Sequence, residues 1–267
     1  MKNLNQISII TPTLNASKFI NNCILSVKNQ KCINVQHIIV DGGSKDNTLE
    51  IIKNYNHLDL FELPGSSIYE ALNYGVAHVK SPLIGFLNAD DEYTKENVLS
   101  LINSLLKCEQ QIIYGNCRFI NSRKRLLYKL KPPSKLNYFF SKIRVFNISH
   151  PSWFISKKAF ESLKGYKTNY KYISDCDLII RALKNKEILF SYINLDIANF
   201  LIHTSNASRT IPASLETKRY NDFLFSRLLF YILQINLYLG DSRYFAYRVK
   251  RFIKFIFDKK QSKRLLK

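Results

Sequence analysis

The amino-acid sequence predicts an α/β fold: a mostly parallel sheet flanked by helices, followed by a basic and aromatic helical extension. Between residues 7 and 87, short apolar runs alternate with stretches of helical spacing. The runs are continuously apolar, as expected of parallel strands buried on both faces. After about Ile211, aromatic and basic residues mix with almost no turn residues. We therefore expect one domain at residues 1–211 and a C-terminal amphipathic helical region at residues 212–267.

The first elements follow one another in β-α-β order. Strands are predicted at residues 7–10, 35–40, 61–63 and 83–87. Helices are predicted at residues 16–30, after Asp46 as a possible cap, and at residues 68–79. Three of these strands end in polar or glycine-containing turns, at residues 11–15, 41–44 and 88–91. Ligands of parallel sheets bind at the carboxyl ends of strands, so this edge is the expected site.

The second half of the sequence is less regular. Strands are predicted at residues 112–114 and 117–121, and the basic run Arg123-Lys124-Arg125 follows them. Residues 150–155 lead into a helix near residues 157–163, and residues 174–184 form a further helix with apolar residues on one face.

Charge and cysteine content limit the possible partners and the compartment. Forty Lys and Arg residues against twenty Asp and Glu give a formal charge of +20, which favours nucleic acid, anionic lipid or phosphorylated substrates. The five cysteines show no CxxC pairing, which indicates reduced thiols in a cytosolic protein rather than disulfides or a zinc site. The apolar run at the N-terminus is too short for a secretory signal, and none elsewhere has the length of a spanning helix. We expect a cytoplasmic protein whose membrane contact is peripheral.

Two polar turns at the expected edge have residue types suited to a nucleotide and a metal. In GFLNADDEY (residues 85–93), Asp90 and Asp91 follow a buried strand, and adjacent carboxylates suit a hard divalent cation. Alternatively, one of the two acids caps a following helix. In VDGGSKDNT (residues 40–48), the glycines allow close backbone approach, and Asp41 offers acceptors to a ribose or base. This segment could also be a plain strand-to-helix turn.

Six segments together resemble the family-2 glycosyltransferases. They occur in the family's order: SIITPTLN, VDGGSKDNT, IYEALNYG, GFLNADD, SHPSWFISKKAFESLKGY and ISDCDLIIRAL. The resemblance covers roughly residues 6–210 and is strongest to bacterial enzymes that build surface polysaccharide. It implies a single domain of the GT-A fold that uses a nucleotide-sugar donor and a divalent metal, Mn²⁺ or Mg²⁺.

The resemblance also implies roles for individual residues near the donor. The nucleotide-sugar-binding set would comprise Pro12, Thr13, Asn15, Asp41, Asn73 and Asn88. Asp90 and Asp91 would hold the metal. Asn88 stands where the family usually has an aspartate, and Glu70 replaces the aspartate of the family's Ile-Tyr-Asp-Ala motif.

On the acceptor side, Asp175 matches the catalytic base of the family's Glu-Asp pair, with Ser174 in place of the glutamate. Asp177 is the rival base; on a helix the two side chains point about 200° apart, so only one can face the pocket. His150 and Trp153 would border the acceptor or pack in the core. His203 is either a metal ligand, as in some GT-A enzymes, or a polar loop residue.

The C-terminal region carries an apolar stripe on a basic helix. Phe245, Val249, Phe252 and Ile256 recur at helical spacing, and the basic residues lie mostly off this stripe. Such a helix either contacts an anionic membrane surface or packs on the catalytic domain.

The sequence thus predicts an inverting glycosyltransferase that moves a sugar from a nucleotide-diphosphate donor to a hydroxyl of a glycan or lipid-linked acceptor. We expect it to act in cell-surface polysaccharide synthesis, peripherally at the inner face of the membrane. Two alternative functions differ in the sequence features they require. A nucleic-acid-binding protein would explain the charge, but no nucleic-acid motif is present. A nucleotide-sugar-synthesising transferase should have a glycine-rich phosphate loop, which TPTLNASKF lacks.

Overall fold

The N-terminal half of the sheet consists of four parallel strands. The computed structural model describes residues 6–136, 148–203 and 206. In spatial order the strands are β3 (Leu58–Glu62), β2 (Val35–Asp41), β1 (Ile7–Thr13) and β4 (Leu83–Phe86). All pairings among them are parallel, as the sequence predicts. β1 extends past its predicted end to include Pro12, which lies beyond the last pair between β1 and β4.

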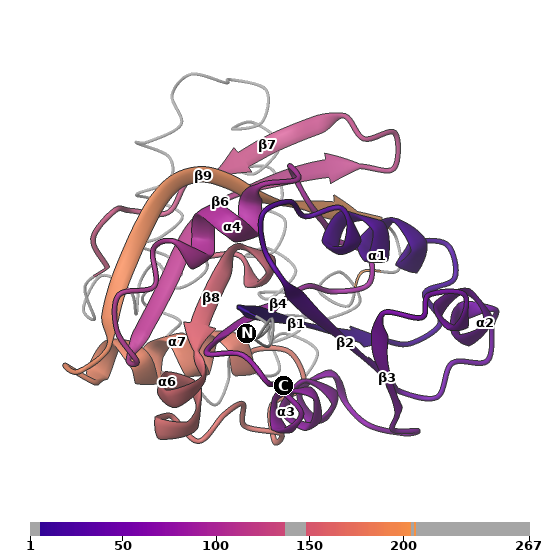
Figure 1. The fold of residues 1–267 in the computed structure, drawn as a ribbon, viewed down its shortest axis with the longest axis horizontal. Coiled ribbons are helices and arrows are strands. Elements are labelled where there is room, and N and C mark those ends of the chain that lie inside the picture. The colour runs from indigo at the N-terminus through magenta and orange to yellow at the C-terminus, as the bar shows by residue number, and fades with distance from the viewer. Residues whose placement is uncertain (1–5, 137–147, 204–205, 207–267) are drawn as a thin grey trace, which may run out of the picture. The chain divides into compact units, whose positions relative to one another are not determined.

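Helices cover both faces of these strands (Figure 1). One face carries α3 (Ile68–Ala77), and the other carries α1 (Ile20–Lys28) and α2 (Thr48–Lys53). α1 begins later than predicted, because the main-chain N–H groups of Ala16 and Ser17 donate to Thr48 Oγ1 and Asp46 Oδ2. Asp46 is not the N-cap of α2, because the N-cap residue is Asn47. Asp46 instead stabilises the preceding turn, where its Oδ1 accepts from the Thr48 N–H at 3.1 Å.

The start and the packing of α3 follow directly from its sequence. Ser67 and Glu70 form a reciprocal capping box, in which Glu70 Oε2 accepts from the Ser67 N–H at 2.8 Å. Gly75 allows the helix to approach β1 closely, since a Cβ there would lie 2.6 Å from Ile10 Cγ2. This close approach sets where the beginning of α3 lies at the sheet edge.

The second half of the chain extends the same sheet. Its strands are β5 (Glu92–Tyr93), β6 (Gln111–Asn121), β7 (Leu126–Leu130), β8 (Trp153–Ser156) and β9 (Leu189–Ile202). The order continues from β4 through β8, β6 and β9 to β5, with β7 paired to β6. β8 runs antiparallel to both β4 and β6, whereas β9 runs parallel to β6. The helical elements are α4 (Val98–Asn103), the 3₁₀ helix η2 (His150–Ser152), α6 (Lys157–Ser162) and α7 (Ser174–Lys184).

β6 is one long strand where the sequence suggests two. Its pairing with β9 shifts register between Tyr114 and Cys117. Gly115 lies in this irregular stretch, and a Cβ there would come within 2.9 Å of the carbonyl oxygens of Ile193 and Leu195. The glycine therefore permits the two backbones to meet where β9 curves over the sheet (Figure 1).

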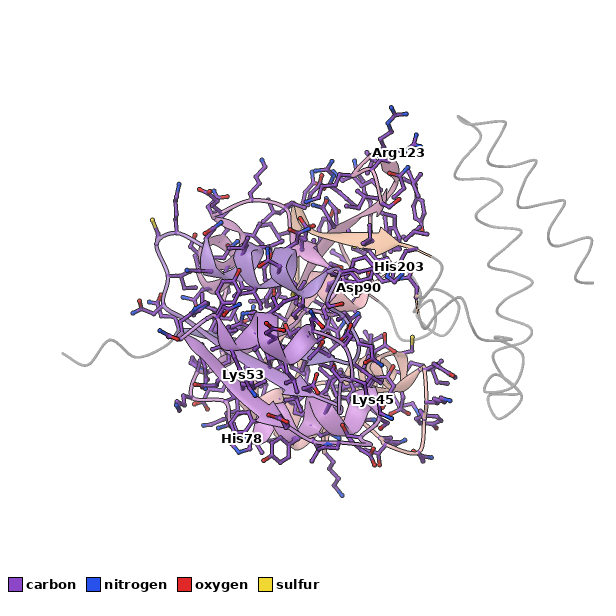
Figure 2. All side chains as sticks on the ribbon, turned by 90° about the vertical axis from the view of Figure 1, so that its right-hand side faces the viewer. Lys45, Lys53, His78, Asp90, Arg123 and His203 are labelled. Carbon is purple, nitrogen blue, oxygen red and sulfur yellow. The ribbon has the colours of Figure 1, made fainter. Side chains whose placement is uncertain are left out.

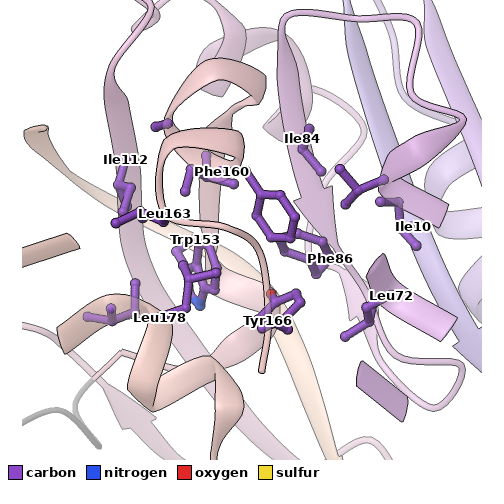
Figure 3. Close-up of a cluster of buried hydrophobic side chains, with 14 of the residues drawn as sticks. Ile10, Leu72, Ile84, Phe86, Ile112, Trp153, Phe160, Leu163, Tyr166 and Leu178 are labelled. Carbon is purple, nitrogen blue, oxygen red and sulfur yellow. The ribbon is translucent and has the colours of Figure 1, made fainter. Parts of the chain in front are cut away.

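The largest group of buried apolar side chains lies between the sheet and helices α3, α6 and α7 (Figure 3). Phe86 at the end of β4 and Trp153 at the start of β8 are 1% exposed and lie at its centre. Within the described ranges, no helix has the length and apolarity needed to cross a bilayer. The predicted amphipathic region at residues 212–267 lies outside the described residues.

Gly85 offers a test of how tightly the two halves of the sheet are joined. A Cβ at Gly85 would lie 2.5 Å from Cε1 of Phe154, which pairs with it across β4 and β8. Gly85→Ala should therefore lower the free energy of unfolding by about 1–3 kcal/mol in urea titrations, the usual cost of overpacking. Gly42→Ala is the control, because a Cβ there meets its nearest neighbours at 3.6 Å. Equal stability of the two variants would contradict this account.

Candidate active site

The turns that follow β1 and β2 are bound to each other at the carboxyl edge of the sheet. The Gly42 N–H donates to the Thr13 carbonyl at 2.9 Å. The Asn15 N–H donates to Ser44 Oγ, and Asn15 Oδ1 accepts from the Lys45 N–H, both at 2.8 Å. Asn15 adopts a φ of 50°, a left-handed conformation that asparagine tolerates better than most residues.

The side chain of Asp41 stabilises the second of these turns by accepting hydrogen bonds from it. Its side chain is fully buried, and Oδ1 accepts from the N–H groups of Gly43 and Ser44 at 2.9 and 2.7 Å. Oδ2 accepts from Ser44 Oγ at 2.5 Å. Nearby, Thr13 Oγ1 is buried with no hydrogen-bond partner among the described residues. The predicted donor-side residues of β1 and β2 thus lie together, with one polar atom left unsatisfied.

Asp90 lies on the turn after β4 and is met by the segment that follows β9. Its Oδ2 atom is 2.9 Å from His203 Nε2 and 3.0 Å from Asn206 Nδ2. The imidazole of His203 stacks on Phe19 with ring centroids 4.5 Å apart, which holds it over the turn (Figure 2). Residues 113 positions apart in the chain therefore meet at one oxygen atom.

Asp91 points into the protein, away from this contact. It is fully buried; Oδ1 accepts from the Leu201 N–H at 3.1 Å, and Oδ2 accepts from Asn88 Nδ2 at 3.3 Å. Burial, with the charge of Asp90 adding to it, raises the pKa of Asp91 well above its ordinary value. Asp91 therefore holds β9 and the Asn88 amide in place.

The donor atoms around Asp90 fit a divalent cation. The amide oxygen Oδ1 of Asn88 is buried with no hydrogen-bond partner among the described residues. The Asp90 carboxylate and the His203 imidazole, 2.9 Å apart, offer oxygen and nitrogen donors of the kinds that bind Mn²⁺ or Mg²⁺, and the Asn88 amide oxygen on the same turn would be a further oxygen donor. No group of three or more His, Cys, Asp or Glu side chains gathers in the described residues.

Asp175 lies in the first turn of α7, where Tyr69 of α3 binds it. The Tyr69 hydroxyl donates to Asp175 Oδ1 at 3.0 Å, and the Asp175 side chain remains partly exposed. Burial, with the charge of Asp175 adding to it, raises the pKa of Tyr69, so the phenol keeps its proton and acts as the donor. A carboxylate that is fixed yet open to solvent can accept a proton from an incoming hydroxyl.

Asp177, two residues along the same helix, forms ion pairs with Lys167 and Arg181. It is 4% exposed, and its two oxygens contact Lys167 Nζ at 3.0 Å and Arg181 Nε at 2.6 Å. Arg181 also donates to the carbonyls of Leu163 and Gly165, so this cluster fastens α7 to the segment after α6. The two acids face different surroundings, as their helical spacing requires.

The two predicted acceptor-side residues lie in an aromatic cluster between the Asp90 turn and Asp175. Trp153 is 1% exposed, and its ring meets the ring of Phe86 edge-on at 5.4 Å. His150 stacks on Phe86, and its Nε2 lies 3.0 Å from the Tyr166 hydroxyl. Burial lowers the pKa of His150, although the charge of Asp175 opposes this, so the ring is neutral near pH 7. The environment of Trp153 is that of a core residue.

Asn73 connects α3 to the segment that precedes α7. Its Nδ2 donates to the Tyr166 carbonyl at 2.8 Å, and its Oδ1 accepts from the Tyr166 N–H at 2.9 Å. A Cβ at Gly165, whose φ is +63°, would lie 2.9 Å from the same amide oxygen. The Asn73 amide is thus used to align Tyr166, whose ring packs 5.3 Å from that of Tyr69.

Sequence analysis assigns no role to four residues that shape this site: Tyr69, Tyr166, Arg181 and Asn206. A signal exists for three of them. Tyr69 lies within IYEALNYG, Tyr166 ends SHPSWFISKKAFESLKGY, and the spacing of four between Asp177 and Arg181 is that of a helical ion pair. For Asn206 the sequence offers no such signal, because its partner Asp90 lies 116 positions away.

Comparison with known proteins gives the family. The profile described as "Glycosyl transferase family 2" matches residues 8–164. A "PGL/p-HBAD biosynthesis glycosyltransferase" of Mycobacterium bovis is 26% identical over 209 residues, covering 72% of this chain and 75% of the relative. A glycosyltransferase of Rickettsia typhi is 27% identical over 194 residues, covering 70% and 61% of the two chains.

Solved structures support the same conclusion for the fold. Staphylococcus aureus TarS 1-349 in complex with UDP-GlcNAc aligns with a TM-score of 0.63 at 18% identity, over 85% of this chain and 66% of that one. The structure with UDP aligns with a TM-score of 0.59 over 74% and 60%. The chain spans 37% of the longer TarS chain. With more than half of its residues matched by the family profile, the chain belongs to glycosyltransferase family 2 and has the GT-A fold.

Proposed function

We propose that the protein is an inverting glycosyltransferase that moves a sugar from a nucleotide-diphosphate donor to a hydroxyl of a glycan or lipid-linked acceptor in cell-surface polysaccharide synthesis. The observation that carries the proposal is that the acids of the site differ in burial and in partners. Asp175 is held by Tyr69 yet open to solvent, whereas Asp177 is buried in an ion pair. Asp90 Oδ2 contacts His203 Nε2, and the amide oxygen of Asn88, two residues earlier, is buried without a hydrogen-bond partner among the described residues.

In the proposed reaction, Asp175 accepts the proton of the acceptor hydroxyl as its oxygen attacks the anomeric carbon. The bond between that carbon and the diphosphate oxygen breaks on the opposite face, and the nucleoside diphosphate leaves with the bonding electrons. The hydrogen bond from Tyr69 fixes the carboxylate, which matters because the transition state resembles an oxocarbenium ion and rewards placement. Inversion follows from attack opposite the leaving group.

On the donor side, Pro12, Thr13, Asn15 and Asp41 would line the nucleotide pocket, with Asn88 near the diphosphate. The unpartnered Thr13 Oγ1 supports this placement. Asn73 would act through Tyr166, to which its amide is bound. A divalent cation held by Asp90, His203 and Asn88 would neutralise charge on the departing diphosphate, with Asp91 orienting the Asn88 amide behind them.

The proposed acceptor side includes His150 at the edge of the aromatic cluster, with Trp153 supporting it from the core. The mycobacterial relatives are named for PGL/p-HBAD biosynthesis, and TarS was solved with UDP-GlcNAc, which supports a nucleotide-sugar donor and a glycoconjugate acceptor here. A peripheral position at the inner face of the membrane accords with the charge of +20. No part of the proposal involves nucleic acid.

Asp90→Ala should reduce transfer at least roughly 100-fold and remove Mn²⁺-dependent nucleotide binding, because the cation would lose its carboxylate. The melting temperature should change little, since this side chain is partly exposed. Activity assays and isothermal titration with UDP would measure both effects. Glu96→Ala, which removes an acid in an exposed ion pair, is the control. Full activity of Asp90→Ala, or of the parent protein in excess EDTA, would refute the metal assignment.

Asp175→Asn should impair catalysis, whereas Asp177→Asn should impair stability. The first should lower turnover by about 10²–10⁴-fold, the usual contribution of a general base, while the donor dissociation constant stays the same. The second should lower the free energy of unfolding by about 1–3 kcal/mol, because Arg181 and Lys167 lose their partner. Single-turnover assays measure the loss of catalysis, and urea titrations measure the loss of stability. A dead but stable Asp177→Asn beside an active Asp175→Asn would reverse the assignment.

Tyr69→Phe should lower kcat roughly tenfold and leave the KM for the donor unchanged, because only the hydrogen bond that positions Asp175 is removed. Tyr74→Phe on the same helix is the matched control, since Tyr74 is 38% exposed. Steady-state kinetics with varied donor would test this. A change confined to KM in Tyr69→Phe would show that the phenol serves the donor instead.

A further inference from the structure

The turn between β6 and β7, together with the first two residues of β7, exposes two leucines beside three basic residues. Residues 122–127, Ser-Arg-Lys-Arg-Leu-Leu, are all exposed, and Leu126 and Leu127 each keep 51% of their surface in contact with solvent. Single exposed leucines are ordinary on protein surfaces, but two in succession next to a basic run are not. We refer to residues 122–127 as the basic turn.

The basic turn has a defined conformation. Asn121 Oδ1 accepts from the N–H groups of Arg123 and Arg125, both at 3.0 Å. The Lys124 N–H donates to the Asn121 carbonyl at 2.8 Å, and Lys124 takes a φ of 56°. The side chains are therefore presented on a structured hairpin end, and docking them requires little ordering of the backbone.

Two of the three basic charges are uncompensated. Lys124 Nζ pairs with Glu92 at 3.1 Å. Within the described part of the chain, the guanidinium groups of Arg123 and Arg125 have no hydrogen-bond or ion-pair partner. Free guanidinium groups bind phosphate oxygens well, and adjacent half-exposed leucines can enter the boundary between headgroups and acyl chains.

The basic turn lies at the same end of the sheet as the candidate active site. Asn121 pairs with Ile202, the residue before His203, and Lys124 contacts Glu92, two residues after Asp90. Figure 2 shows Arg123 on the side of the molecule where Asp90 and His203 lie. A flat surface that touches this turn would therefore lie near the opening of the site.

We propose that the basic turn docks the enzyme on an anionic phospholipid bilayer. Leu126 and Leu127 enter the interface, while Arg123 and Arg125 bind lipid phosphates. The docking itself stands on the exposure and charge of these four residues. Its purpose, the delivery of a lipid-linked acceptor to the site, rests on the function proposed above. This surface lies in the described residues and is separate from the amphipathic region predicted at residues 212–267.

Vesicle sedimentation with the full-length protein tests the proposal. The vesicles would be phosphatidylcholine alone or with roughly 30% phosphatidylglycerol, which gives an anionic surface. Leu126→Gln/Leu127→Gln and Arg123→Gln/Arg125→Gln should each lower the partition coefficient on anionic vesicles roughly tenfold. The matched controls are Leu101→Gln/Leu189→Gln, at 37% and 43% exposure, and Lys53→Gln/Lys107→Gln. Both control pairs should stay within about twofold of the parent protein.

A second measurement detects insertion directly. In Leu127→Trp, the emission of the added indole should shift to the blue on anionic vesicles, because the side chain leaves water. The one native tryptophan, Trp153, is already buried and should not respond. Absence of a shift would overturn the proposal, as would parental vesicle binding by either test pair. Weaker binding by the arginine pair alone would indicate simple attraction to polyanions and would equally overturn insertion.

Donor hydrolysis in solution, measured on every variant, separates the docking from the catalytic proposal. All the variants should keep parental hydrolysis, since none touches the site. If hydrolysis is absent even from the parent protein while the test pairs still lose vesicle binding, the proposed function fails and the docking surface stands. If hydrolysis is normal and vesicle binding is unaltered, the docking surface alone is wrong.

Discussion

The hydrogen bond between Asp91 Oδ1 and the Leu201 N–H joins segments 110 positions apart, and the geometry of the site depends on it. Asp91 is fully buried, so water does not compete for this bond. The bond fixes the end of β9, and two residues later His203 reaches Asp90. Through its other oxygen, Asp91 also orients the amide of Asn88. Asp91 thus supports the site from within the protein, whereas Asp90 is the acid placed to contact a ligand. A cation beside Asp90 would lower the electrostatic cost of keeping them together.

Asp175, the proposed base, is positioned by packed rings rather than by opposite charge. Phe86 ends β4 just before the Asp90 turn, and from it ring contacts run through His150 and Tyr166 to Tyr69, which binds Asp175. Close packing of this kind resists displacement, because moving one ring requires the others to move. The turn that carries Asp90 and the proposed base Asp175 are therefore connected through one packed cluster of rings at the end of β4.

Local patterns predicted the parallel strands, the helices between them and the edge where the site lies, because apolar runs and glycine-rich turns report local structure directly. They failed where long-range pairing decides. The meeting of His203 with Asp90 requires β9 to pair with β6 in one register, across a bulge that Gly115 permits. Asp177 illustrates the intermediate case. Helical geometry predicts that only one of the two acids faces the pocket, and the ion pair of Asp177 with Arg181, which only the folded chain reveals, supports Asp175 as the proposed base.

Arg181 and Asn73 bind the segment before α7 through main-chain atoms only: the carbonyls of Leu163, Gly165 and Tyr166, and the Tyr166 N–H. These bonds depend little on the identity of the segment's side chains, whereas the ion pair between Lys167 and Asp177 adds a contact that does. Lys164 is exposed on this segment, but its φ of 59° favours residues that tolerate the left-handed conformation, and Gly165 is confined by its φ of +63° and by the Asn73 amide. Over evolutionary time, the exposed positions of such a segment can diversify at the border of the proposed acceptor site, while the frame that carries the proposed base is inherited unchanged.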